Sequence, residues 1–363
     1  MSTRVYVCFG TGGVGKTTIS AALGTALAKR GARTLVMTFD PARRLAEAFG
    51  VEAAAVPVPV TPTLTCYMPE AEASAQRTVH TLFGHDRTRA AQLAQNPVLA
   101  TLVDGLSGMH EIGALAELTS LAPGYDAVVI DTAPTRHALE LLTLPERIAA
   151  LVDSRALRWL ADAARARLGT ANAEKQSAWS RLVDFGQARV VTELTRSLGG
   201  APIAACMELV SALMDERETL SAIARSAQAL LASRSTTYAI VGSPRPGLLD
   251  DVAFFRDGIA RVAQPPQWLV LNRFVERQPD WPAQLTDHPR ASPALRNAAR
   301  TAGAELRALA EYGQRAVAGA RARFPQLRVA RVPRLDAAQP SAVVAAASVA
   351  LLPMLQTDLR VSA

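Results

Sequence analysis

The chain has 363 residues, of which 49% are hydrophobic and 20% are charged. This balance is typical of globular proteins that fold in water, and it excludes a disordered chain. The net charge of +7 arises from arginines scattered along helical stretches among acidic residues, so we interpret it as solvated helix faces and disfavour nucleic acid or a membrane surface as partners.

The cysteine pattern and the hydropathy pattern both favour the cytoplasm. Cys8, Cys66 and Cys206 are odd in number, far apart and without a C-x-x-C pair, which fits a reducing compartment. The first residues, "MSTR", lead directly into a predicted strand and leave no room for a signal peptide. The longest apolar run, residues 342–355, is too short to cross a bilayer, and we expect a helix buried against a sheet.

The chain begins with alternating strand and helix patterns. The continuous apolar run "RVYVCF" predicts a central parallel strand, and residues 17–30 carry apolar side chains at helical spacing up to Gly31. Five further strands are predicted, three of them late in the chain. They lie at "TLVMTFD" (34–40), in "YDAVVIDTAP" (128–130, leading into Asp131), and at "TTYAIVGS" (236–243), "QWLVLN" (267–272) and "QLRVARVP" (326–333).

Strands separated by helices predict an α/β fold with a doubly wound, mostly parallel sheet. Residues 69–122 and 145–232 carry no strand pattern, and we interpret them as helical insertions that form a subdomain of one domain, residues 1–363. Residues 236–363 then complete the core, and the proline-rich residues 56–63 are expected to be a stiff connection.

A glycine-rich loop, "FGTGGVGKTT", follows the first strand. Gly10, Gly15, Lys16 and Thr17 fit the phosphate-binding template G-x-x-x-x-G-K-[ST]. Such a loop turns its backbone N–H groups toward an anion, and the helix that follows adds its positive end. We therefore expect Lys16 to reach the β- and γ-phosphates of ATP and the Thr17 hydroxyl to bind Mg²⁺.

Two acidic residues stand at strand ends, where a doubly wound sheet binds its ligand. Asp40 and Asp131 are suited to holding a metal ion through its water ligands and to orienting the attacking water. Each of them alone is also compatible with a helix N-cap, because helical patterns follow both.

The stretches "GTGGVGKTT", "FDPARRLAEAF" and "YDAVVIDTAPTRHALELLTLP" together resemble the ArsA family. This family includes the arsenite-pump ATPase and the guided-entry ATPase that targets tail-anchored membrane proteins, and it belongs to the deviant P-loop class that also holds the ParA and MinD ATPases. "SGMHEIGALAEL", "VGSPRP", "LVLNRF" and "ARVPRLD" are similar to the same branch. The resemblance implies a dimeric ATPase that uses Mg²⁺.

The resemblance also implies roles for particular residues. Lys16 and Asp40 would be catalytic, with Asp40 orienting or deprotonating the attacking water, and Thr17, Asp40 and Asp131 would hold the metal. Asn272 would hydrogen-bond the adenine, and the segment from Pro333 would pack around the base. The residues expected to contact nucleotide are Gly10, Thr11, Gly12, Gly13, Val14, Gly15, Lys16, Thr17, Thr18, Asn272, Pro333, Leu335 and Asp336.

The most consequential departure from the family pattern is Thr11, where the family has a lysine that reaches the phosphates of the opposite subunit. A cation of this general kind contributes about 10³ to 10⁵ in rate. Arg43, Arg44 and Arg136 are candidates to replace it, although each is also compatible with an ordinary surface arginine. We hypothesise either a heterodimer with a related, lysine-bearing ATPase or a homodimer that hydrolyses ATP slowly.

Two metal sites of relatives are not expected here. No C-x-x-C follows Asn272, so the structural zinc of the eukaryotic targeting factors is not predicted, and the three cysteines do not align with the metalloid ligands of the arsenite pumps. We expect all three cysteines to be buried and structural.

Our first hypothesis is an ATP-driven dimeric switch of the ArsA type that acts on an unknown protein client through its helical subdomain. Met207 and Met214 lie on an amphipathic stretch, residues 204–231, which fits either a client groove or core packing. The alternative is a positioning ATPase of the ParA or MinD kind that acts on DNA, a membrane or a scaffold. A degenerate, purely structural subunit is a third hypothesis.

Overall fold

The computed structural model describes residues 3–40, 42, 44–99, 107–133, 136–168, 200–276, 281–335 and 339–358. The chain divides into two compact units. The sheet unit comprises residues 1–68, 122–142 and 231–363, and the helical unit comprises residues 69–121 and 143–230.

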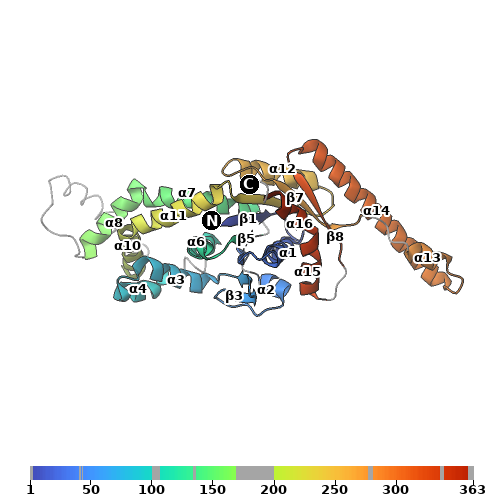
Figure 1. Cartoon of the computed structure of the whole chain (residues 1–363). Coiled ribbons are helices and arrows are strands. Elements are labelled where there is room, and N and C mark those ends of the chain that lie inside the picture. The colour runs from blue at the N-terminus through green and yellow to red at the C-terminus, as the bar shows by residue number, and fades with distance from the viewer. Residues whose placement is uncertain are drawn as a thin grey trace. The chain divides into compact units, whose positions relative to one another are not determined.

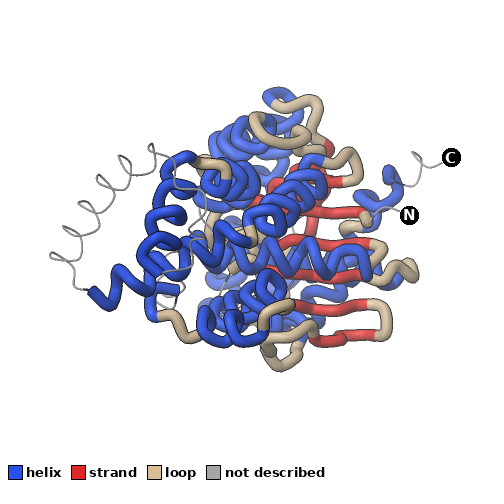
Figure 2. Tube along the Cα trace, turned by 90° about the vertical axis from the view of Figure 1, so that its left-hand side faces the viewer, coloured by secondary structure: helices blue, strands red, loops and turns tan. Residues whose placement is uncertain are grey.

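Within the described residues, eight strands form one sheet in the order β3-β4-β2-β5-β1-β6-β7-β8 (Figures 1 and 2). Adjacent strands pair in parallel except β3 and β4, which are antiparallel. This arrangement confirms the predicted fold class. The strands are β1 (Arg4–Phe9), β2 (Thr34–Thr38), β3 (Val58–Thr61), β4 (Leu64–Tyr67), β5 (Ala127–Asp131), β6 (Thr236–Gly242), β7 (Trp268–Phe274) and β8 (Arg328–Pro333).

Successive side chains of a strand point to opposite sides of the sheet. Each face of the sheet therefore packs against its own set of helices. On one face, Tyr6 and Cys8 belong to a buried cluster with residues of α1 and α15. On the other face, the Phe9 ring lies 6.1 Å from the ring of Phe255 in α12. Figure 1 shows α1 and α12 on opposite sides of the sheet. The helices of this unit are α1 (Lys16–Lys29), α2 (Arg44–Phe49), α12 (Leu248–Ala260), α13 (Trp281–Asp287), α14 (Pro293–Arg323), α15 (Pro340–Ala350) and α16 (Leu352–Asp358), with short 3-10 turns η1 (Ala122–Gly124) and η2 (Arg136–Leu139).

Two local expectations were wrong. The predicted stiff connection, residues 56–63, contains strand β3 and part of a hairpin, because the proline at position 59 is tolerated on an edge strand. The apolar run 342–355 is two helices rather than one, and α15 lies against α1, α2 and β8. The break precedes Pro353, whose missing N–H prevents the helix from continuing without interruption.

The described part of the helical unit contains helices and no strand. Phe83, Leu93 and Ala212 belong to its buried cluster. Met207 and Met214 are also buried, at 4% and 5% exposure, which favours core packing over a client groove for these two side chains. The helices are α3 (Ala71–Phe83), α4 (Arg87–Ala94), α6 (Ser107–Leu121), α7 (Glu140–Val152, whose first turn belongs to the sheet unit), α8 (Arg155–Leu168), α10 (Gly200–Asp215) and α11 (Arg217–Ala232).

Candidate functional site

The glycine-rich loop joins β1 to α1 at the carboxyl edge of the sheet. Gly13 and Gly15 have φ values of 76° and 86°, in the left-handed region that favours glycine. At Gly10 the requirement is close approach, because a Cβ there would lie 2.3 Å from the backbone oxygen of Val241 in β6. The parallel pairing of β1 with β6 therefore fixes where the loop begins.

Lys16 begins α1 and lies across this loop. Its side chain is buried at 6% exposure, and Nζ donates a hydrogen bond of 3.1 Å to the backbone oxygen of Thr11. Burial lowers the pKa of the Lys16 ammonium, and the negative charges of Asp131 and Asp40 oppose this shift. The Lys16 side chain thus bridges the loop, and its ammonium is positioned to bind an anion that the loop holds.

Asp131, at the end of β5, is fully buried and accepts hydrogen bonds from three hydroxyls. Thr17 Oγ1 and Thr38 Oγ1 donate to Oδ2 at 2.8 and 3.2 Å, and Ser20 Oγ donates to Oδ1 at 3.3 Å. Burial raises the pKa of this carboxyl from 3.8 to about 6, although the hydroxyls and the charge of Lys16 oppose the rise.

The second acid, Asp40, lies just beyond β2 and is joined to the first through Thr38. The Asp40 backbone N–H donates to Thr38 Oγ1 at 3.0 Å, and that hydroxyl also contacts Asp131. The Asp40 side chain is 12% exposed, accepts from the backbone N–H of Ala42 at 3.0 Å, and has Oδ2 3.6 Å from Nη1 of Arg44. The loop and both acids therefore converge at one edge of the sheet.

Two adjoining cavities open along this edge. One, of about 280 Å³, is lined by Lys16, Thr17, Asp40 and Arg44 among others. The other, of about 430 Å³, is lined on one side by the apolar side chains of Val332, Pro333, Leu335, Val343 and Ala347, and on the other by Asn272. The residues common to both are Gly15, Thr18 and Arg273. The small cavity is lined by charged side chains, and the larger one combines an apolar side with the polar side chains of Asn272, Arg273 and Arg334. Together they offer room for an anionic group beside the loop and for a flat ring against the apolar side.

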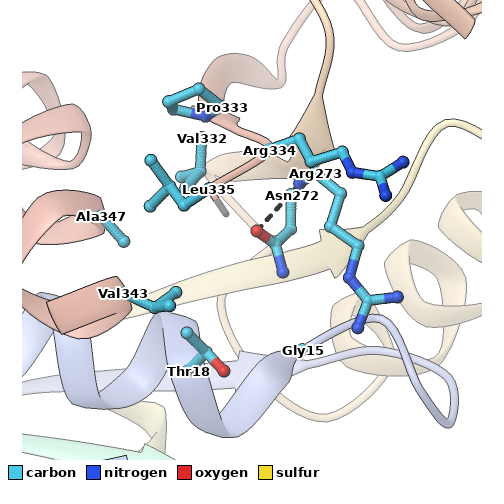
Figure 3. Close-up of a pocket in the computed structure, with 10 residues that line it drawn as sticks. All are labelled: Gly15, Thr18, Asn272, Arg273, Val332, Pro333, Arg334, Leu335, Val343 and Ala347. Atoms are coloured by element: carbon cyan, nitrogen blue, oxygen red, sulfur yellow. Dashed lines mark hydrogen bonds between the residues drawn. The ribbon is translucent and has the colours of Figure 1, made fainter. Parts of the chain in front are cut away.

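Figure 3 shows the Asn272 side chain pointing into the larger cavity toward Gly15 and Thr18. Nδ2 donates to the backbone oxygen of Val14 at 2.9 Å, and Oδ1 accepts from the backbone N–H of Arg273 at 2.9 Å. A side-chain amide has two donors and two acceptor positions, so one of each remains for a ligand. A Cβ at Gly15 would lie 2.3 Å from Nδ2, so this contact requires glycine.

The structure places most of the predicted site residues around these two cavities. Asp336 and Arg43 lie outside the described residues, as does the side chain of Arg136. Sequence reasoning missed Ser20 and Thr38, which complete the hydroxyl cage of Asp131. The only available signals were the spacing of Ser20 three residues after Thr17 and the position of Thr38 two residues before Asp40.

Two arginines were also missed. Arg273 lines both cavities and has a φ of 56°, a left-handed conformation that is rare outside glycine. Arg245 hydrogen-bonds the side chain of Thr11 at 2.7 Å. Arg245 lies in "VGSPRP", but only the pairing of β6 with β1 brings that segment to the loop.

In the part of the chain that the structure describes, no group of three or more His, Cys, Asp or Glu side chains could hold a metal ion. Cys8 and Cys66 are buried, and burial raises the pKa of each thiol to about 12. Among the helices with assigned residues, none combines the length and the apolar character needed to cross a bilayer.

Comparison with known proteins identifies relatives. The chain is 32% identical to a putative arsenical pump-driving ATPase of Chlorobaculum tepidum over 147 residues, 40% of this chain and 36% of the relative. It is 30% identical to the uncharacterized protein SCO2128 of Streptomyces coelicolor over 275 residues, 74% of this chain and 62% of the relative. It is 34% identical to ATPase GET3 of Malassezia globosa over 148 residues, 40% of this chain and 43% of the relative.

In each of these comparisons the chain covers less than two thirds of the relative's length. A family model described as "Anion-transporting ATPase" matches residues 3–240, which include β1, the glycine-rich loop, both acids and the helical unit. The resemblance noted in the sequence is confirmed: this chain belongs to the ArsA family of anion-transporting ATPases.

Proposed function

We propose that the chain binds MgATP at the carboxyl edge of the sheet and hydrolyses it. The cycle of binding and hydrolysis would switch the protein between two states of association, one with ATP bound and one with ADP bound. The observation that carries this proposal is the convergence of Lys16, Thr17 and Asp131 beside a charged cavity that shares lining residues of the loop with the larger cavity beside Asn272. Membership of an ATPase family supports the same reaction.

The phosphates would lie against the loop, where backbone N–H groups and the positive end of α1 face an anion. Lys16 Nζ, now hydrogen-bonded to the Thr11 oxygen at 3.1 Å, would exchange that neutral acceptor for phosphate oxygens. A phosphate oxygen carries negative charge and the Thr11 oxygen does not, so attraction between opposite charges favours the exchange.

The residues beside the loop fit Mg²⁺. Magnesium takes oxygen ligands, keeps several waters, and is held by one or two protein groups together with substrate phosphates. Thr17 Oγ1 would be a direct ligand, and the Asp131 carboxylate, which accepts from that hydroxyl at 2.8 Å, would orient it and the metal's waters. Held by these residues, Mg²⁺ would supply positive charge that offsets the negative charge of the phosphates.

The adenine would lie in the 430 Å³ cavity. The apolar side chains of Leu335, Val343 and Ala347 would cover its faces, and the remaining donor and acceptor of Asn272 would bind its edge. An amide that offers both a donor and an acceptor matches the paired acceptor and donor on the adenine edge.

Asp40 is placed to handle the water. In hydrolysis the water oxygen bonds to the γ-phosphorus, and the bond to the bridging oxygen breaks with its electron pair remaining on ADP. The proton released by the water passes to the Asp40 carboxylate and then to solvent. Because Asp40 is 12% exposed and lines the small cavity, its carboxylate is accessible to such a water.

We extend the proposal to a dimer that closes on ATP, either of two identical chains or with a related ATPase, and to a protein client. The relatives named as arsenical pump-driving and GET3 ATPases support an energy-coupling role. Unpaired thiols suit action in a reducing cytoplasm.

The test is phosphate release together with mass in solution. With MgATP, wild-type chain, alone or with its partner ATPase, is expected to release phosphate and to gain mass relative to MgADP. Lys16→Ala should do neither. Lys29→Ala is the matched control, because Lys29 ends the same helix and contacts Ser348 rather than the loop. Turnover by Lys16→Ala at the wild-type rate would overturn the proposal.

A further inference from the structure

The end of strand β7 is irregular where it meets the site. Asn272 and Arg273 lie between Leu271 and Phe274, where the pairing of β7 with β8 shifts register. Irregularities of this kind re-aim a side chain and recur next to active sites. Arg273 has a φ of 56°, and no other described residue except glycine has a positive φ. This conformation is strained for an arginine and persists only where the surrounding structure imposes it.

The irregularity directs the Arg273 side chain toward the glycine-rich loop. Figure 3 shows it running past Asn272 toward Gly15. Arg273 lines the larger cavity together with Asn272 and the smaller cavity together with Lys16, and it shares this double position with Gly15 and Thr18. The Arg273 backbone N–H donates to Asn272 Oδ1 at 2.9 Å, so one local bend positions both side chains.

The guanidinium of Arg273 is available for a ligand. None of the described residues forms a hydrogen bond or an ion pair with it, and the side chain is exposed. The other two cations of the smaller cavity are engaged, because Lys16 donates to the Thr11 oxygen and Arg44 lies 3.6 Å from Asp40. Arg273 therefore keeps its fork of N–H donors for a planar, bidentate contact with an anion.

We infer that Arg273 is an affinity-determining residue whose guanidinium binds the phosphate attached to the ribose of the nucleotide held by its own chain. In the proposed binding mode the base occupies the larger cavity and the terminal phosphates occupy the smaller one. The group that links them passes the residues common to both cavities, and Arg273 is the cation among these. This inference rests on the proposed function. Because ATP and ADP both contain this phosphate, the contact strengthens the binding of both and does not act on the bond that breaks.

The test is calorimetric titration with MgADP and with a non-hydrolysable ATP analogue plus Mg²⁺. Arg273→Gly is expected to bind both about 10- to 100-fold more weakly than wild type, the range for a hydrogen bond to a charged group. Turnover at saturating MgATP should stay near that of wild type, since uniform binding affects KM alone. Equal affinities of wild type and variant, or a loss confined to the ATP analogue, would overturn the inference.

Arg331→Ala is the matched control. Arg331 lies in the adjacent strand β8, has its guanidinium 3.6 Å from Glu276, and lines neither cavity. Its replacement removes an arginine from the same region and is expected to leave both nucleotide affinities unchanged. A loss as large as that of Arg273→Gly would mean that general positive charge, rather than one directed contact, holds the nucleotide.

Stability without nucleotide separates binding from folding. Glycine adopts a left-handed φ without strain, so Arg273→Gly is expected to unfold at a urea concentration no lower than wild type does. A variant that is at least as stable and yet binds more weakly has lost a ligand contact. A lower unfolding midpoint together with weaker binding would assign the effect to the fold and overturn the inference.

Two further variants identify the group that Arg273 contacts. Arg273→Lys keeps the charge and should recover part of the affinity, whereas Arg273→Gln keeps a donor without the charge and should not. If both recovered affinity equally, the contacted group would be neutral, such as a ribose hydroxyl, and the assignment to phosphate would be wrong.

The outcomes distinguish this inference from the proposed function. If the wild-type chain binds neither MgADP nor the ATP analogue, the proposed function fails. If wild type binds both and Arg273→Gly binds both equally well, the nucleotide site stands and only the role of Arg273 is overturned.

Discussion

At the scale of single residues, the burial of Asp131 disfavours the charged carboxylate that its proposed role beside the metal requires. The carboxyl is fully buried, and three hydroxyls donate to it. The folded-state pKa of about 6 exceeds the unfolded value of 3.8, so the native state binds this proton more tightly than the unfolded chain. The free energy of unfolding contributed by this group therefore falls as pH rises from below 3.8 through 6.

The first prediction concerns Asp131→Asn, which removes this titration at nearly constant volume. Relative to wild type, the variant should become more stable as the pH rises from 4 to 7, as measured by urea denaturation at several pH values. Its MgATP affinity at pH 7 should be weaker, because the amide carries no charge for the metal.

Asp126→Asn is the control, because its stability relative to wild type should change with pH in the opposite direction. Hydrogen bonds from exposed Arg33 lower the pKa of Asp126 to about 2, so its contribution to stability is lost as pH falls toward that value. Relative to wild type, this variant should lose stability as pH rises from 2 to 4. If both variants showed the same pH dependence, the burial argument for Asp131 would be wrong.

The sequence predicts the chemistry of this site better than its supporting contacts. Lys16 and Asp131 follow from a motif and a strand end. Ser20 and Arg245 depend on the rotation of α1 against β5 and on β6 lying beside β1, and neither property is encoded in local spacing.

At the scale of elements, the loop and α1 depend on glycine at the position where they meet. Gly15 precedes α1 with a left-handed φ of 86°, and a Cβ would lie 2.3 Å from Asn272 Nδ2. The start of α1 and the end of β7 are therefore coupled through one residue that has no side chain.

We predict that Gly15→Ala lowers the free energy of unfolding by about 1–3 kcal/mol, the usual cost of a strained backbone conformation, and weakens ATP binding. Gly31→Ala isolates the backbone contribution, because Gly31 has a φ of 85° and a Cβ added there would meet nothing within 4 Å. Chemical denaturation should show the larger loss for Gly15→Ala. Equal losses would mean that the approach to Asn272 is unimportant.

Sequence periodicity misjudged the elements whose structure depends on pairing with an adjacent element. β3 forms because it pairs with β4 at the edge of the sheet, although Pro59 argues against a strand interior. By contrast, the strongly apolar runs of β1, β2, β5, β6 and β7 predicted their strands directly, because central parallel strands are buried on both faces. The edge strand β8, whose sequence contains two β-branched valines, was predicted as well.

At the scale of the whole molecule, a chain of an ATPase family contains a mostly parallel sheet. The glycine-rich loop and the two acids lie together at the carboxyl edge of that sheet. In the loop, Thr11 Oγ1 accepts a hydrogen bond of 2.7 Å from Arg245 Nη2. This contact joins the segment after β6 to the loop after β1, and it follows from the parallel pairing of those two strands.

The central claim is that the edge of the sheet holds MgATP, and calorimetric titration tests it most directly. We predict one MgATP per chain, weaker binding of MgGTP because Asn272 presents the wrong hydrogen-bond pattern to guanine, and no measurable binding to Lys16→Ala. Absence of heat with wild-type chain, or equal affinity in Lys16→Ala, would contradict the account.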